Sequence, residues 1–253
     1  MKPAAEIMGA NNSMLIDQRD EILKGKTYKD SRVILVTPTR GDRIITCKCG
    51  QKFNISLGIH PNVVMTWLSL MMPLNNKYYR LMISGAEVDA AYNAAIKVIL
   101  NHDELKTWKY MLTMEDDQLL QPDSLLKLIS TAKEGNWDAV GGLIWMKQDE
   151  PSPMIYGDPS DPEDFTHRNP IDNTVMECNA MGMGFTLFNL DMFREGKIEE
   201  PYFKTVEEWD GETRLFDTQD LYFFRKAKKA GYRFAVDTNI KVGHLDTETG
   251  QVY

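Results

Sequence analysis

The chain has 253 residues, enough for one large α/β domain or two small ones, and its 43% hydrophobic and 26% charged residues are typical of a globular protein. Its 29 basic and 37 acidic residues give a net charge of −8, which argues against a general nucleic-acid coat protein but leaves room for a local basic groove. No stretch approaches the roughly 20 apolar residues of a membrane span, residues 1–10 lack the features of a signal peptide, and three cysteines cannot form a disulfide framework. We therefore expect a cytoplasmic protein with reduced thiols.

The predicted elements alternate between strands and helices after a polar N-terminal extension, residues 1–30. The β-branched run at residues 32–36 predicts a buried parallel strand, followed by a loop at residues 37–40, whereas residues 41–60 look irregular. Further strands are predicted over residues 79–84, 108–114, 139–145, 232–237 and 240–244, and helices over residues 61–72, 86–100, 122–135 and 216–230. The alternation predicts a single α/β domain over residues 31–253, with an open, mainly parallel sheet flanked by helices.

Residues 148–175 are rich in Pro, Asp and Gly and predict a long loop. Loops of this length are uncommon as simple connections in compact domains, so we expect a lid or an acceptor-binding loop.

Three adjacent carboxylates, Glu115, Asp116 and Asp117, follow the apolar strand predicted at residues 108–114. In open α/β sheets, ligands bind at the carboxyl ends of the strands. Neighbouring carboxylates repel one another, and a divalent cation such as Mg²⁺ or Mn²⁺ relieves that repulsion through oxygen ligands. The alternative is a solvated acidic turn before the next helix.

Two further candidates lie in the last third of the chain. Asp220 stands in the first turn of the predicted helix at residues 216–230, where a carboxylate is either a general base or a helix cap. His244 ends the strand-like run at residues 240–244, and a histidine there is either structural or a metal ligand. Alone, neither residue decides between its two roles.

In their order and spacing, these segments resemble the GT-A glycosyltransferases, which use nucleotide sugars and have a Rossmann-like sheet. Glu115-Asp116-Asp117 is similar to the Asp-x-Asp motif of that family, and Gln219-Asp220 is similar to its Glu-Asp pair. The other matching segments are Thr37-Pro38-Thr39-Arg40, Ala91-Tyr92-Asn93-Ala94-Ala95 with Tyr92 in place of the usual Arg, Met181-Gly182-Met183-Gly184-Phe185, and Val242-Gly243-His244. The resemblance covers roughly residues 31–246 and is closest to soluble phage or bacterial members.

The resemblance implies a metal-dependent glycosyltransferase, either a hexosyl- or a pentosyltransferase, with Mn²⁺ or Mg²⁺ as cofactor. It implies Asp117, Glu115 and His244 as metal ligands and Asp220 as the catalytic base. The residues implied to contact the donor are Thr37, Pro38, Thr39, Arg40, Asn93, Glu115 and Asp116. A UDP-sugar is the expected donor, and a saccharide or another hydroxyl compound is the expected acceptor.

Two other enzymatic functions stay open from the sequence, besides a non-catalytic metal- or sugar-binding module, which would not need Asp220 near the metal. One is the same transfer to a modified base of phage DNA, which would call for a basic, aromatic-lined groove beside the metal site. The other is a nucleotidyltransferase, although residues 37–41 lack a full Gly-rich nucleotide loop. Cys47 and Cys49 resemble half of a zinc knuckle, but a zinc site needs four ligands, so two free thiols are the preferred interpretation.

Overall fold

The computed structural model describes residues 31–253 except 40–41, 47–51, 57, 75–76 and 210–213. Its main feature is a seven-stranded sheet. The strands of this sheet are β1 (Val33–Thr39), β4 (Tyr78–Ser84), β5 (Tyr110–Met114), β7 (Ala139–Leu143), β9 (Val175–Cys178), β11 (Phe185–Asn189) and β14 (Phe234–Lys241).

The strand order across the sheet is β4-β1-β5-β11-β7-β14-β9. Strand β1 is parallel to β4 and β5, and β14 is parallel to β7. Strand β11 is antiparallel to both β5 and β7, and β9 is antiparallel to β14, so β4, β1, β5, β7 and β14 all point the same way. The expected α/β fold with an open, mostly parallel sheet is confirmed.

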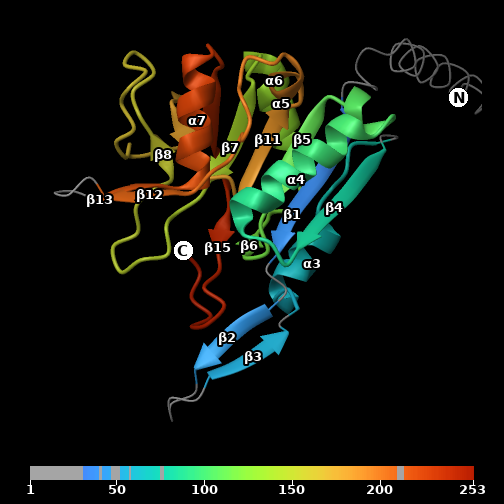
Figure 1. The fold of residues 1–253 in the computed structure, drawn as a ribbon, viewed down its shortest axis with the longest axis vertical. Helices are drawn as coiled ribbons and strands as arrows, with labels where there is room; N and C mark the ends of the chain where they lie inside the picture. The colour runs from blue at the N-terminus through green and yellow to red at the C-terminus, as the bar shows by residue number, and fades with distance from the viewer. Residues whose placement is uncertain (1–30, 40–41, 47–51, 57, 75–76, 210–213) are drawn as a thin grey trace, which may run out of the picture.

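Helices cover both faces of the sheet (Figure 1). One face packs against α4 (Val88–Asn101), α6 (Asp191–Arg194) and α7 (Gln219–Lys229), and the other against α3 (Pro61–Ser69) and α5 (Ser124–Gly135). Strand β1 shows why both faces are apolar: Ile34 and Val36 join the first core, and residues 33 and 35 join the second. A 3₁₀ turn, η1 (Leu105–Thr107), precedes β5.

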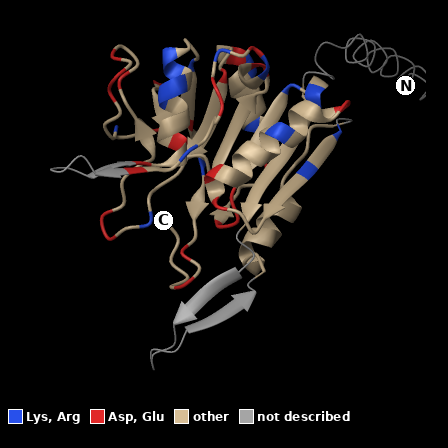
Figure 2. Ribbon diagram, viewed as in Figure 1, with Lys and Arg blue, Asp and Glu red and all other residues tan. Residues whose placement is uncertain are grey.

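Among the described residues, four short antiparallel pairs of strands lie outside the main sheet. They are β2 (Asp42–Thr46) with β3 (Lys52–Ser56), β6 (Gln118–Leu119) with β15 (Gly243–His244), β8 (Ile155–Tyr156) with β10 (Ala180–Met181), and β12 (Val206–Trp209) with β13 (Arg214–Asp217). Figure 2 shows that charged residues lie mainly on the helices and connecting segments, whereas the strands of the main sheet carry few of them.

The structure differs from the sequence-based expectation in two places near the N-terminal half of the sheet. Residues 42–46 and 52–56, within the span expected to be irregular, instead form the antiparallel pair of strands β2 and β3. Strand β1 continues through residues 37–39, which were expected as a loop. Pro38 is tolerated in β1 because the pairing of β1 with β5 ends at Val36. Beyond Val36, β1 pairs only with β4. Cys47 and Cys49 lie outside the described residues.

The segment 148–175 is tied to the rest of the molecule by specific bonds. It contains β8, and a bridge joins Trp145 to Pro153. The side-chain amide of Asn179 donates to the backbone carbonyls of Asp158, Asp161 and Asp164 at 2.9, 2.7 and 2.9 Å. The segment is therefore a structured surface, and its role as a lid stays a prediction. None of the described helices is both long enough and apolar enough to cross a membrane.

Candidate active site

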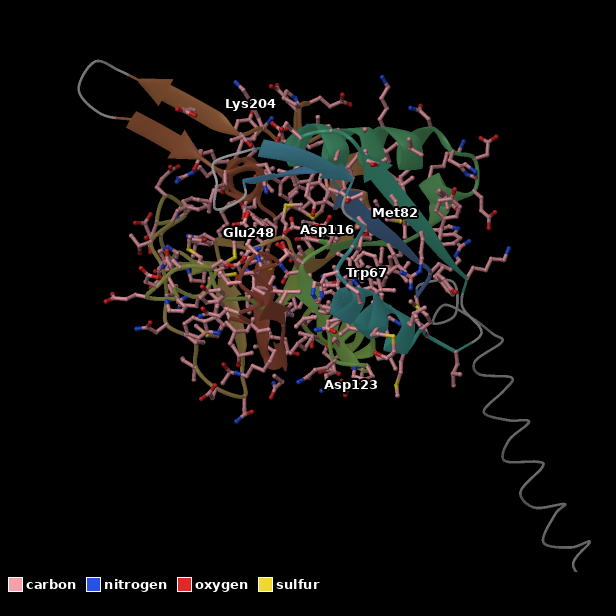
Figure 3. All side chains as sticks on the ribbon, turned by 90° about the horizontal axis from the view of Figure 1, so that it is seen from below. Trp67, Met82, Asp116, Asp123, Lys204 and Glu248 are labelled. Carbon is pink, nitrogen blue, oxygen red and sulfur yellow. The ribbon has the colours of Figure 1, made fainter. Side chains whose placement is uncertain are left out.

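The candidate site lies at the carboxyl ends of β1 and β5. The two strands pair in register up to Val36 and Thr113, so their carboxyl ends lie side by side. Figure 3 views this end of the molecule from below and places Asp116 near the middle of the face. The five residues of β5 are all buried, which fixes the position of the acidic segment that follows them.

Glu115 is held by two contacts from different parts of the chain. Its backbone N–H donates to the carbonyl of Gly184 at 3.0 Å, and the hydroxyl of Tyr92 in α4 donates to its Oε1 at 3.0 Å. Burial and the negative charge of Asp117 raise the pKa of Glu115 to about 8, although the Tyr92 hydrogen bond acts in the opposite direction. Tyr92, which replaces the arginine of the family pattern, therefore contacts the acidic motif directly.

Asp117 is the centre of a second group of side chains, which we call the Asp117 cluster: Asp117, Gln118, Lys147 and His244. Its Oδ1 accepts from the Gln118 amide at 2.8 Å, and its Oδ2 lies 2.5 Å from Lys147 Nζ and 3.4 Å from His244 Nε2. The pairing of β15 with β6 brings His244 beside Gln118, and the N–H of Leu245 donates to the backbone carbonyl of Asp117 at 2.8 Å. Two segments far apart in sequence thus meet at one carboxylate.

The orientation of the His244 ring is set by the backbone carbonyl of Trp145. This oxygen lies 2.7 Å from Nδ1, and because a carbonyl can only accept, Nδ1 carries the hydrogen. A neutral ring then turns the lone pair of Nε2 toward Asp117, and a protonated ring donates to Asp117 instead. A hydrogen bond from the other ring nitrogen, such as the one from Nδ1 to the Trp145 carbonyl, is how metal-binding histidines are usually oriented.

The electrostatic state of Asp117 reflects the side chains that contact it. Burial raises the pKa of this carboxyl, but the contacts with His244 and with the Lys147 ammonium lower it, and the net result is a pKa well below the ordinary value. Asp117 is therefore a carboxylate at neutral pH. Lys147 was not among the residues expected from the sequence, because it precedes the polar segment 148–175 and its partner lies 30 residues upstream.

Asp220 lies in the first turn of α7 and is 4% exposed. Its Oδ1 accepts from the Thr218 hydroxyl and, at 3.0 Å, from the backbone N–H of Leu221. Burial raises the pKa of Asp220, and its charge contributes to the raised pKa values of Glu115 and Tyr92, so Asp220 lies within electrostatic range of the acidic motif.

The expected donor-contacting residues are distributed unevenly. Thr37 and Pro38 are buried in β1 and Thr39 is partly exposed at its end, while Arg40 lies outside the described residues. Asn93 uses its side chain within the chain: Nδ2 donates to the carbonyls of Asp89 and Phe203 at 2.9 and 2.7 Å, and Oδ1 accepts from the N–H groups of residues 202 and 203 at 2.9 and 3.2 Å. The contacts of Asn93 thus fasten the segment around residue 203 to α4.

The glycine-rich segment of residues 181–185 runs beside the acidic motif. A Cβ on Gly184 would lie 2.7 Å from Cδ of Gln118, so only glycine fits there without a shift of that side chain. Gln118 is fully buried, and its Oε1 accepts no hydrogen bond from any described residue. The glycine therefore allows Gln118 to reach Asp117.

The Asp117 cluster contains atoms of the kinds that bind a divalent cation. Within the described parts of the chain, no group of three or more His, Cys, Asp or Glu residues is arranged to hold a metal ion. Asp117 and His244 nevertheless present one oxygen and one nitrogen 3.4 Å apart. Mg²⁺ and related ions are commonly held by one or two protein ligands together with substrate phosphates and water, so this pair fits such an ion. In this structure, Lys147 Nζ contacts Asp117 Oδ2, which is the oxygen that would bind the ion.

Comparisons with known proteins bear on the fold. No family model matches the chain, and no curated protein matches its sequence. The chain is similar to A197 from STIV, with a TM-score of 0.56 and 17% identity over 87% of this chain and 92% of that one. It is also similar to GalNAc-T7, solved with UDP, GalNAc and Mn²⁺, with a TM-score of 0.48 and 10% identity over 88% of this chain and 45% of that chain. The first match shows a shared fold alone, and the second is too distant to support an argument.

Proposed function

We propose that this chain is a metal-dependent glycosyltransferase that moves a sugar from a nucleotide-sugar donor, expected to be a UDP-sugar, to a hydroxyl acceptor. The observation that supports the proposal most strongly is the contact between Asp117 and His244 at the carboxyl edge of the sheet, 3.4 Å apart. Both residues were expected at a metal site from the order of the sequence motifs, although 127 residues separate them.

In the proposed reaction, Asp117 and His244 Nε2 would hold Mn²⁺ or Mg²⁺, while the backbone carbonyl of Trp145 keeps the histidine ring in position through Nδ1. The bound cation would supply positive charge to the diphosphate leaving group. Asp116 and the end of β1 contact the nucleotide, and Glu115 is held near it by Tyr92 and Gly184.

Asp220 is proposed as the base that removes the proton of the acceptor hydroxyl. Its raised pKa, caused by burial, makes it a better proton acceptor than an exposed aspartate. A carboxylate that acts directly on the acceptor implies inversion at the anomeric carbon.

The proposal is tested by ligand-induced stabilisation. UDP-sugars should raise the melting temperature in the presence of Mn²⁺ and much less with EDTA, because a ligand stabilises the folded state by mass action. The Asp117→Asn variant should lose the Mn²⁺-dependent part, whereas Asp103→Asn, which changes a carboxyl with 98% exposed side chain, should behave like the wild type. Asp220→Asn should retain this shift yet transfer sugar about 10²–10⁴-fold more slowly.

Stabilisation of equal size in EDTA, or in the Asp117→Asn variant, would contradict the metal role. A panel of acceptors, including saccharides and duplexes with hydroxylated bases, tests the acceptor class in the same way, through product formation.

A further inference from the structure

Lys147 makes the shortest polar contact in the Asp117 cluster. Its Nζ lies 2.5 Å from Asp117 Oδ2 and donates to the carbonyl of Leu245 at 3.3 Å. The side chains of Lys147 and Asp117 are 32% and 17% exposed, so this ion pair is partly shielded from water. A shielded pair is worth more than one on the open surface, and it also excludes other cations more effectively.

The ammonium and a divalent cation compete for the same atom. Asp117 Oδ2 is the oxygen that faces His244 Nε2, and it is also the oxygen that Lys147 contacts. Because two positive charges at this spacing repel strongly, Lys147 cannot stay in place while a divalent ion is held between Asp117 and His244. Yet the acidic motif needs a counter-charge when no ion is bound, since the charges of Asp116, Asp117 and Asp220 all act on this region and raise the pKa of Glu115.

We propose that Lys147 is an exchangeable counter-ion that makes cation binding depend on the donor. Without donor, Lys147 neutralises Asp117 and keeps divalent-ion affinity low. When a nucleoside diphosphate is bound, Lys147 leaves Asp117 for the diphosphate oxygens, and Asp117 becomes available to the cation. The inference rests on the proposed function, because it assigns a positioning role to a residue of the same site.

The side chain and its position suit this exchange. Lysine is a compact charge on a flexible stem of four carbons, so it can change partners with little rearrangement, unlike the rigid fork of arginine. Lys147 lies four residues after the end of β7 at Leu143, beyond the buried part of the sheet. Its stem is therefore free of the core packing that would hold the ammonium in one place.

The proposal predicts effects of opposite sign for two ligands. In Lys147→Met without nucleotide, Mn²⁺ affinity, measured from the electron paramagnetic resonance signal of free Mn²⁺, should rise about tenfold. In the same variant, UDP affinity at saturating Mn²⁺, measured by calorimetry, should fall about tenfold. Lys147→Arg keeps the charge and should leave the affinity for Mn²⁺ low, as in the wild type.

The matched control is Lys241→Met, which removes an exposed lysine paired with Asp172 at 3.1 Å. It should change neither affinity. The gain in Lys147→Met should also disappear in the double variant with Asp117→Asn, because the freed carboxylate is its cause.

The inference is overturned if Lys147→Met binds Mn²⁺ no more tightly than Lys241→Met, or if it gains Mn²⁺ affinity while UDP binding is unchanged. The proposed function is judged separately, by whether wild-type donor binding needs both Mn²⁺ and Asp117. A wild type that binds UDP through Asp117 beside an inert Lys147 would keep the function and remove the inference. A wild type that binds no UDP would instead remove the proposed function, and with it the dependence on donor that the inference assigns to Lys147.

Discussion

At the scale of single residues, Glu115 shows how burial and neighbouring charges change a carboxyl group. It lies at the end of a fully buried strand, between Tyr92 and the glycine-rich segment, and next to Asp117. Its pKa is raised to about 8 in the folded protein from an ordinary 4.5, because burial and the Asp117 charge both disfavour its ionised form. In the unfolded chain these influences are absent.

This difference predicts that the wild type loses folding stability as pH rises, and that Glu115→Gln removes this loss. As pH rises from about 4.5 to about 8, the unfolded chain ionises Glu115 while the folded protein keeps it protonated, so the wild type loses stability over that range. Each unit of pKa difference between the folded and unfolded states changes the free energy of unfolding by at most about 1.4 kcal/mol, and partial exposure of the side chain makes this change smaller. Without divalent ions, urea unfolding should therefore show Glu115→Gln gaining stability over the wild type as pH increases.

The control is Glu134→Gln, which makes the same chemical change on the exposed surface of α5. Equal pH profiles for the two variants would mean that Glu115 is ionised in the folded protein at neutral pH.

At the scale of elements, the glycine-rich segment controls the geometry of the acidic motif. Gly184 binds Glu115 through its carbonyl, and its missing side chain leaves room for the buried Gln118 that holds Asp117. The segment therefore sets the positions of two of the three carboxylates. In the sequence, Met181-Gly182-Met183-Gly184-Phe185 indicated only a segment similar to one of the glycosyltransferases.

Gly184→Ala should damage both the fold and the proposed metal site. The new methyl group would lie 2.7 Å from Gln118, so the side chain must shift, which typically costs about 1–3 kcal/mol in a well-packed interior. Urea unfolding should show that loss of stability, and the Mn²⁺-dependent stabilisation of the protein by UDP should become smaller. Gly58→Ala is the control, because no described atom lies within 4 Å of the added carbon. Similar behaviour of the two alanine variants would show that Gln118 adapts freely.

The elements themselves were predictable to different extents. The continuous apolar runs of β1 and β5 gave buried strands, and proline at the start of α3 marked that helix correctly. The hairpin of β12 and β13 was missed, because each strand is four residues long and its pairing is invisible in the sequence. The partner of Lys147 was missed for the same reason, since ion pairs between distant segments leave no local pattern.

At the scale of the whole molecule, two cores share one sheet. The core between the sheet, α4 and α7 contains a connected group of aromatic rings that includes Phe188, Phe193, Phe203 and Phe223. The ring of Phe223 in α7 lies 4.8 Å from that of Phe203, and Asn93 of α4 holds the backbone of Phe203. The start of α7, and with it Asp220, is therefore positioned by packing across the molecule.

Truncation at the centre of that group should destabilise the whole fold. Phe223→Ala should lower the free energy of unfolding by about 3–5 kcal/mol, because it removes a fully buried ring from between several others. Urea denaturation followed by circular dichroism measures the loss. Leu126→Ala, at a position 37% exposed on α5, should cost much less. Equal losses would mean that the aromatic group is not a centre of stability.

The overall architecture was foreseen because alternating strands and helices leave few ways to build a covered sheet. Sequence order could not show which residues of the last third return to the acidic motif by direct contact. His244 does so through the pairing of β15 with β6, whereas Asp220 acts on Glu115 through its charge.

The acidic motif follows a buried strand, whereas Lys147 and His244 come from segments outside the cores, and this difference has an evolutionary consequence. Glu115, Asp116 and Asp117 extend from a strand whose residues are all buried, so their placement is inherited with the sheet. Lys147 and His244 come from short outer segments, and neither is part of the two hydrophobic cores. Substitutions at these two positions would change the charge and ligands beside Asp117 without repacking the interior. Under the proposed function, a lineage with this fold would therefore gain or lose dependence on a divalent ion through one or two changes outside the cores, while its architecture stays the same.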